Sequence, residues 1–446
     1  MGKITHVIKR SGAQVPFNPK RIANAIYRAA VAVGGRDKKL AQNLADQVVS
    51  YLNDHYEEGK APHIEEVQDA VEKILIENGH ASVAKAYILY REDRARKRQE
   101  KARRASVPSE NIPWAKIWGV LDWASSRGLD SITGLNNRIE DNEFAHVVHE
   151  SESAYEADLD MAAEMVLEKI EKLKMVFISG PSSSGKTTTT IKLEERLKKH
   201  GLKLVAINVD NYFFDLEMHP KDEFGDYDFE TPQALDLELI NKHFCDLIEG
   251  EEIKIPFYDF KTGTRKLDQT PMKLAEDEIL LIDSLHGLYP PMTAGIDPER
   301  MFKLYLEPLL QMRGPDSDYV RWTDIRLMRR MLRDAKYRAY NPQQTLEHWH
   351  YVRASELRNI IPYINTTDYI VNTGMPYELC IYKPMLFEYF EKWNTEYADD
   401  PLHEDAYERA KRVYRMLNAV QPVEDVSPIP ATSVLREFIG GSTYEY

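Results

Sequence analysis

KMVFISGPSSSGKTT, residues 174–188, is the stretch that decides the fold class of this chain. It contains the spacing G-x-x-x-x-G-K-T, in which Gly180 and Gly185 allow successive backbone N–H groups to point at phosphate oxygens. Lys186 can supply an ammonium to the outer phosphates, and the Thr187 hydroxyl can ligate Mg²⁺. The apolar run before the loop and the helical pattern after it predict a strand, a phosphate-binding loop and a helix. The residues predicted to bind ATP are Gly180, Ser182, Ser183, Ser184, Gly185, Lys186, Thr187 and Thr188.

The composition limits the class of protein. A chain of 446 residues is longer than one hydrophobic core usually grows, which predicts two or three domains. A formal net charge of -14 argues against a surface that binds nucleic acid. Two cysteines, Cys245 and Cys380, are too few for a disulfide framework or a four-thiolate zinc site, which suits the cytoplasm. No window of the sequence approaches the apolar length of a membrane span, so we expect no membrane partner.

Further apolar runs follow the loop at residues 203–210, 278–283, 303–307 and 369–372, and they alternate with helical segments. This pattern is typical of an α/β domain with a doubly wound parallel sheet, whose ligands bind beyond the carboxyl ends of the strands. Two of the runs end in aspartate. Asp283 is in a position to hold Mg²⁺ beside the loop. Asp210 is either a base that accepts the proton of an attacking hydroxyl or a cap for the next turn, and spacing alone leaves both open.

The first part of the chain predicts a small β-hairpin followed by four helices. It resembles the ATP-cone, a nucleotide-sensing regulatory module of ribonucleotide reductases, in VIKRSG (7–12), VPFN (15–18), KRI (20–22), IEEVQDAVE (64–72) and VAKAYILYR (83–91). The resemblance implies a site for regulatory ATP or dATP formed by Val7, Lys9, Arg10, Asn18 and Arg21. A small helical oligomerisation domain is the alternative.

A second resemblance covers residues 174–374. VDNYF (209–213), DFETPQALD (228–236), IPFYDF (255–260) with Arg265, and RRMLRD (329–334) are similar to the uridine kinase and phosphoribulokinase family. The resemblance implies that Asp210 is the catalytic base and that Asp283 helps Thr187 to hold Mg²⁺. It also implies a helical lid whose arginines neutralise the transferring phosphoryl group, with Arg333 and Lys186 as catalytic cations. The implied lid arginines are Arg329, Arg330, Arg333 and Arg338, and the implied acceptor-binding residues are Asp210, Tyr212, Glu230, Tyr258, Arg265, Arg330 and His348.

The chain departs from the uridine kinase pattern mainly where that family reads the base. Gly263 stands where uridine kinases have a base-recognising histidine, and His348 corresponds to a lid glutamine. Glu230 replaces the family's acid, and residues 338–340 replace an Arg-Gly-Arg segment. The parts for phosphoryl transfer are therefore kept, while those for base recognition are altered.

The sequence thus predicts an ATP-cone at residues 1–95, a connector at 96–156, a P-loop kinase domain at 157–375 and a helical extension at 376–446. The expected function is ATP- and Mg²⁺-dependent phosphorylation of a hydroxyl on a nucleoside such as uridine or cytidine, regulated through the cone. A sugar, polyol or pantothenate-like acceptor is the alternative within the enzymes, and a slowly hydrolysing nucleotide switch is the alternative outside them. A homo-oligomer is compatible with the sequence. A zinc-containing repressor with a cone is opposed by the two cysteines.

Overall fold

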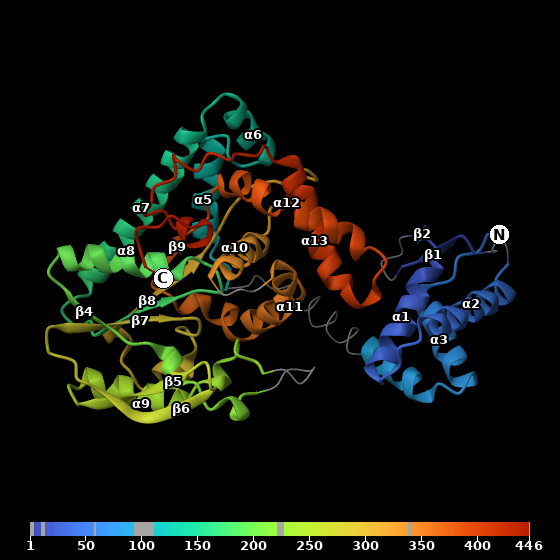
Figure 1. Cartoon of the computed structure of the whole chain (residues 1–446), viewed down its shortest axis with the longest axis horizontal. Coiled ribbons are helices and arrows are strands. Elements are labelled where there is room, and N and C mark those ends of the chain that lie inside the picture. Colours follow the sequence, from blue (N-terminus) through green and yellow to red (C-terminus); the bar gives the residue numbers. More distant parts are fainter. Residues whose placement is uncertain are drawn as a thin grey trace. The chain divides into compact units, whose positions relative to one another are not determined.

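The computed structural model describes residues 4–9, 14–57, 59–92, 111–220, 227–337 and 341–445. The chain divides into two compact units, one of Met1–Ser109 with Glu396–Glu404, the other of Glu110–Thr395 with Asp405–Tyr446 (Figure 1). Arg10 and Arg338, both predicted to bind phosphate groups, lie outside the described residues.

The first unit begins with an antiparallel pair of short strands, β1 (His6–Ile8) and β2 (Gln14–Pro16). Three helices follow, α1 (Pro19–Ala32), α2 (Lys38–His55) and α3 (Ile64–Glu77), and residues 81–92 are helical as well. Asn18 starts α1, because its side chain accepts the Lys20 N–H at 3.0 Å and proline occupies the first turn. Ile26, Val48 and Leu75 from the three labelled helices meet in a core of the unit's own. The predicted hairpin with helices is confirmed.

The second unit contains a five-stranded parallel sheet in the order β4-β7-β3-β8-β9, which confirms the predicted doubly wound domain. Its strands are β3 (Met175–Ser179), β4 (Lys203–Ala206), β7 (Glu278–Ser284), β8 (Met301–Glu307) and β9 (Tyr369–Asn372). Ile178 of the central strand pairs with Asp283 on one side and Leu304 on the other. Asp283 therefore reaches the same edge of the sheet as the phosphate loop.

Strand β4 is shorter than the apolar run at residues 203–210 predicts. It ends at Ala206, and the 3-10 helix η1 (Val209–Tyr212) follows. The Asn208 side chain accepts the Asp210 N–H at 2.9 Å, and this local hydrogen bond starts the turn in place of further strand pairing. Asp210 consequently stands in a turn beyond the sheet.

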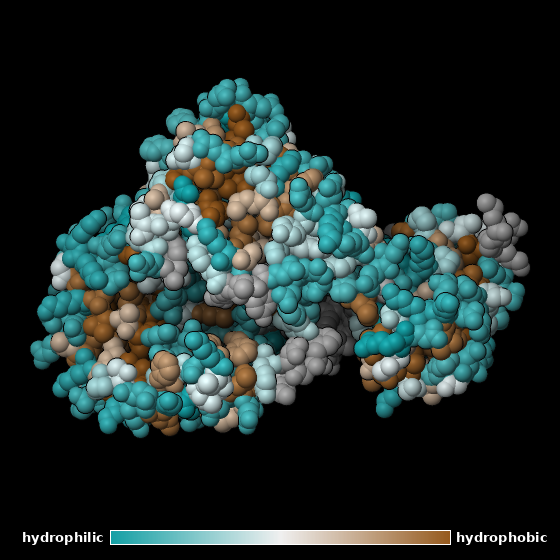
Figure 2. All heavy atoms as spheres, viewed as in Figure 1, coloured by the Kyte–Doolittle hydropathy of each residue, from teal (hydrophilic) through white to brown (hydrophobic). Residues whose placement is uncertain are grey.

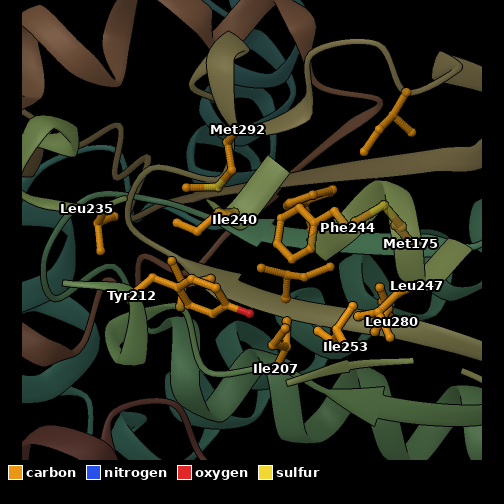
Figure 3. Close-up of a cluster of buried hydrophobic side chains, with 14 of the residues drawn as sticks. Met175, Ile207, Tyr212, Leu235, Ile240, Phe244, Leu247, Ile253, Leu280 and Met292 are labelled. Carbon is orange, nitrogen blue, oxygen red and sulfur yellow. The ribbon is translucent and has the colours of Figure 1, made fainter. Parts of the chain in front are cut away.

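One face of the sheet packs on α9 (Leu237–Ile248) through a buried hydrophobic cluster (Figure 3). Phe177 of β3 meets Phe244 of α9 edge to face, with ring centroids 5.8 Å apart, and Met175, Ile240 and Met292 surround them. A long hairpin of β5 (Ile253–Asp259) and β6 (Thr264–Met272), which the sequence analysis did not assign, adds Ile253 and Tyr258 to this cluster.

The remaining helices cover the rest of the unit. Their bounds are α5 (Trp114–Ser126), α6 (Ile132–Glu140), α7 (Phe144–Glu168), α8 (Lys186–Lys199), α10 (Trp322–Tyr337), α11 (Pro342–Asn359), α12 (Glu378–Glu396), α13 (Glu404–Ala419) and α14 (Arg436–Ile439). Helix α7 packs against α8, and α14 packs against α10. A hydrogen bond from Thr188 to Glu437 also places α14 beside the start of α8, near the C-terminus (Figure 1).

Helix α5 leaves part of its apolar surface uncovered. Trp114 and Trp118 are 60% and 69% exposed. Figure 2 shows further hydrophobic residues in brown where α5 and α7 lie in Figure 1. None of the helices in the described ranges combines the length and the apolar character that crossing a bilayer requires.

Candidate functional site

The phosphate loop connects β3 to α8, and its two glycines sit where no side chain fits. A Cβ on Gly180 would lie 2.6 Å from the backbone oxygen of Leu306. Gly185 has a φ of +90°, and a Cβ there would lie 2.5 Å from Val434 Cγ2. The two glycines therefore let the loop pack closely against β8 and Val434, and Gly185 also supplies the left-handed backbone angle that a side chain disfavours.

Polar groups inside the loop lack the partners that buried groups normally have. The hydroxyls of Ser183 and Ser184 are buried and have no hydrogen-bond partner among the described residues. Lys186 donates to the backbone oxygens of Gly180 at 2.9 Å and Pro181 at 3.3 Å. Burial lowers the pKa of Lys186, and the nearby carboxylate of Asp283 opposes that shift. A bound polyanion would satisfy the hydroxyls and the ammonium together.

Arg330 of α10 connects a residue predicted to bind ATP, Ser182, with one predicted to bind the acceptor, Glu230. Its Nη1 donates to Ser182 Oγ at 3.0 Å and to Glu230 Oε1 at 2.9 Å, while Nε donates to Asp334 at 3.2 Å. The Glu230 backbone oxygen in turn accepts the hydroxyl of Ser355 on α11. One guanidinium thus joins the phosphate loop to the segment that is predicted to bind the acceptor.

Asp283 interacts electrostatically with three other charged residues of the site. Burial raises its pKa to about 6, the Lys186 charge lowers it, and the carboxylates of Glu437 and Asp210 raise it further. Asp210 itself is exposed on η1, as is Thr187 in the first turn of α8. In the described part of the chain, no three His, Cys, Asp or Glu side chains are placed to hold a metal ion. Asp283 and Thr187 still suit Mg²⁺, which takes one or two protein oxygens and completes its shell with phosphates and water.

The arginines of α10 separate into two groups. Arg326 and Arg329 are fully buried, the first between Glu307 and Glu356 and the second against Glu378. Arg330 and Arg333 are only partly buried, and the charge of Arg333 contributes to the lowered pKa of Lys186. The structure therefore places Arg330 and Arg333 at the phosphate loop and Arg329 in an internal ion pair.

The residues predicted to bind the acceptor do not all face one space. Tyr258 is buried among aromatic rings, with the Phe213 centroid 5.5 Å away. Arg265 donates to Asp236 at 2.9 Å. Tyr212 is buried in the core, and its hydroxyl lies 2.9 Å from His243 Nδ1. His348 is exposed on α11, seven residues before Ser355 and so about 10 Å away along the helix.

Two residues near the loop escaped the sequence analysis. His286 is 3% exposed, and neither ring nitrogen has a hydrogen-bond partner in the described residues. Burial, aided by the Lys186 charge, lowers the pKa of His286 to about 3 and keeps the ring neutral, while the nearby Glu230 backbone, too poorly aligned for a full hydrogen bond, opposes the shift. His286 follows Asp283 by three residues, and this spacing could have marked it as a residue near the site. Glu437, which bonds to Thr188, lies 249 residues further along the chain, and no local pattern marks it.

In the first unit, the predicted regulatory residues lie around the hairpin and the start of α1. Lys9 and Arg21 are exposed, whereas Val7 is 8% exposed and belongs to the core. The Asn18 side chain caps α1. Two cations and the first turn of a helix are thus the groups available there to an anion.

Comparison with protein families gives two matches. Residues 5–96 match the ATP cone domain, and residues 175–379 match the phosphoribulokinase / uridine kinase family. The uridine kinase of Deinococcus deserti is 27% identical over 201 residues, which cover 45% of this chain and 87% of the relative. Uridine-cytidine kinase 2-B of Danio rerio is 30% identical over 184 residues, covering 39% of this chain and 63% of the relative.

The first unit has relatives of a different kind. The vitamin B12-dependent ribonucleoside-diphosphate reductase of Thermoplasma acidophilum is 43% identical over 103 residues, and the match covers 22% of this chain but only 13% of the reductase. Among solved structures, D-glycerate 3-kinase from Cryptococcus neoformans is 13% identical with a TM-score of 0.33, covering 45% of this chain and 87% of that one. The chain therefore carries an ATP-dependent kinase domain of the phosphoribulokinase / uridine kinase family at residues 175–379, preceded by an ATP cone domain at residues 5–96.

Proposed function

We propose that this protein uses ATP and Mg²⁺ to phosphorylate a hydroxyl group of a uridine- or cytidine-like nucleoside, and that its ATP cone binds regulatory ATP or dATP. The observation that carries the catalytic part is the bridge that Arg330 makes between Ser182 of the phosphate loop and Glu230. It links the site for the donor phosphates to the segment expected to hold the acceptor. The names of the uridine and uridine-cytidine kinase relatives support a nucleoside as that acceptor.

In this proposal each polar group has one task. Asp210, exposed beyond β4 and within electrostatic range of Asp283, accepts the proton of the attacking hydroxyl. Lys186 and Arg333 stabilise the charge on the transferring phosphoryl group. Thr187 and Asp283 would hold Mg²⁺, which when bound would neutralise further phosphate charge.

A second acceptor class is favoured by one specific observation. Gly263, which stands where uridine kinases have a base-recognising histidine, has a φ of +67°, and a Cβ there would lie 2.8 Å from Leu216 Cβ. The Gly263 backbone oxygen also accepts the Leu216 N–H at 2.8 Å. Leu216 thus occupies the space that a side chain at position 263 would need. An acceptor without a base to recognise, such as a sugar, a polyol or pantothenate, is compatible with this arrangement.

The test is ADP release by the purified chain with ATP and Mg²⁺ over a panel of nucleosides, sugars, polyols and pantothenate, each beside a control without acceptor. Stimulation by uridine or cytidine is the expected result. Stimulation by another acceptor alone would keep the mechanism and replace the substrate. Slow hydrolysis that no acceptor stimulates would favour a nucleotide switch and contradict the kinase proposal.

A further inference from the structure

Helix α8 begins without a capping side chain of its own. Its N-cap is Gly185, which makes no side-chain hydrogen bond to the first turn. The missing cap comes from α14 instead. Glu437 Oε2 accepts the backbone N–H of Thr188 at 3.3 Å and the Thr188 hydroxyl at 2.9 Å, and Glu437 is only 6% exposed. A buried carboxylate from the other end of the unit therefore holds the first turn of the phosphate-loop helix.

The Thr188 N–H is also a group that the nucleotide needs. Thr188 is the third residue of α8, and phosphate loops present the N–H groups of this first turn to the α- and β-phosphates. Glu437 thus occupies a position where a phosphate oxygen belongs. Two anions cannot share the same donors without strong repulsion in a buried site, so binding of one displaces the other.

The charges around Glu437 point the same way. Burial lowers the pKa of Lys186, and the Glu437 carboxylate is close enough to oppose that shift. Burial raises the pKa of Asp283, and Glu437 adds to that increase. It therefore neutralises part of the cationic charge that ATP would use. When phosphates arrive, the same carboxylate adds repulsion instead.

The segment that carries Glu437 is fastened to both parts of the site. Val434 packs against Gly185 of the loop, and the Phe438 ring lies 5.1 Å from the guanidinium of Arg329 on α10. Lys336, at the end of α10, donates to the Ile439 backbone oxygen at 3.2 Å. Release of Glu437 from Thr188 would therefore loosen residues 433–440 and their contacts with α10.

We propose that Glu437 belongs to the nucleotide site. Its carboxylate accepts the hydrogen bonds of the Thr188 N–H and hydroxyl until a nucleotide phosphate replaces it. The inference rests on the proposed function, because it requires ATP at this loop. It adds that the C-terminal segment sets how tightly the nucleotide binds.

The first test is calorimetric titration of the full chain with a non-hydrolysable ATP analogue and Mg²⁺. We expect Glu437→Gln to bind the analogue about tenfold more tightly than the wild type, because the competing charge is gone. Glu437→Asp should also bind more tightly, since the shortened side chain does not reach Thr188, and it decides the matter if the glutamine variant fails to fold. Glu424→Gln, at an exposed position of the preceding segment, is the matched control and should bind as the wild type does.

The second test uses the wild type alone. Hydrogen exchange of residues 433–440 should become faster when the analogue saturates the protein, because Glu437 leaves Thr188. Unchanged or weaker binding by folded Glu437 variants, or slower exchange of this segment, would make Glu437 a structural cap and overturn the inference while leaving the kinase proposal intact. If neither the wild type nor the variants bind the analogue, the proposed function fails together with the inference.

Discussion

Arg329 of α10 and Glu378 of α12 form an ion pair in which both side chains are 0% exposed. Nε and Nη2 of the arginine donate to the two carboxylate oxygens at 2.7 and 2.9 Å, and Nη2 also donates to the Thr373 backbone oxygen at 2.6 Å. The Thr373 hydroxyl donates to the backbone oxygen of Ser184 at 2.6 Å. The pair therefore fixes α10 to the residues that support the phosphate loop.

Replacing Arg329 by leucine should lower the free energy of unfolding by about 3–5 kcal/mol, because Glu378 would stay buried without a partner. Arg333→Leu, on the same helix but only partly buried, should cost much less stability and should lower kcat instead. Urea unfolding and ADP release, measured on both variants, check the contrast. A fall in kcat for Arg329→Leu at unchanged stability would assign that arginine to the moving lid.

The substitution Asp210→Asn should reduce kcat by about 10²–10⁴-fold while leaving ATP affinity nearly unchanged, because it removes a base and no phosphate ligand. Steady-state kinetics and titration with the ATP analogue check the two halves of this expectation. Weaker ATP binding with normal turnover would show that Asp210 holds the nucleotide or caps the turn.

The metal-free protein should lose stability through Asp283 as the pH rises. Burial raises the pKa of this carboxyl from 3.8 to about 6, so the folded protein holds the proton more tightly than the unfolded chain does. The stabilising contribution is complete below about pH 4, disappears between pH 4 and pH 6, and then stays constant. Urea unfolding in EDTA across this range should show the decrease in the wild type and in Asp318→Asn, an exposed control, but not in Asp283→Asn. The same slope in all three proteins would contradict the assignment.

Gly263→Ala should destabilise the kinase domain by more than 1 kcal/mol, because the alanine meets both an unfavourable φ and the Leu216 side chain. Gly250→Ala is the matched control, since Gly250 has a φ of +81° but open space around its Cβ position. The difference between the two urea midpoints isolates the steric part. Equal losses would mean that Leu216 moves aside freely and that the space beside position 263 is available to a ligand.

If the cone senses nucleotide, the double variant Lys9→Ala, Arg21→Ala of the full chain should need about tenfold more dATP for the half-maximal change in kinase activity. The kcat without dATP should not change, because these exposed cations lie in the first unit. Lys39→Ala, another exposed cation of that unit, serves as the control. An unchanged dATP response in the double variant would remove the site from this surface.

The fold was predictable where local pattern and tertiary packing agree. The five residues of β3 are all buried, so the apolar run before Gly180 had only one reasonable interpretation. The end of β4 was not predictable, since it depends on a hydrogen bond that the Asn208 side chain accepts from the Asp210 N–H. The β5–β6 hairpin was missed because β6 is mostly exposed and carries little alternation of apolar and polar residues.

The site divides in a similar way. The phosphate loop follows from spacing alone, because every fixed position has a backbone or charge requirement. The α10 arginines look alike in sequence, and only packing separates Arg329, which faces Glu378, from Arg330, which faces Ser182. Partners such as these lie 49 and 148 residues apart, beyond any local pattern.

The cap that Glu437 provides to α8 has a consequence for synthesis of the chain. Thr188 leaves the ribosome 249 residues before Glu437 does, which at about 5–20 residues per second is a delay of roughly 12–50 s. During that interval Glu437 is not yet present to accept hydrogen bonds from Thr188. If ATP binds this loop as proposed, it can therefore stabilise the growing domain before the last residues supply Glu437 as a competitor.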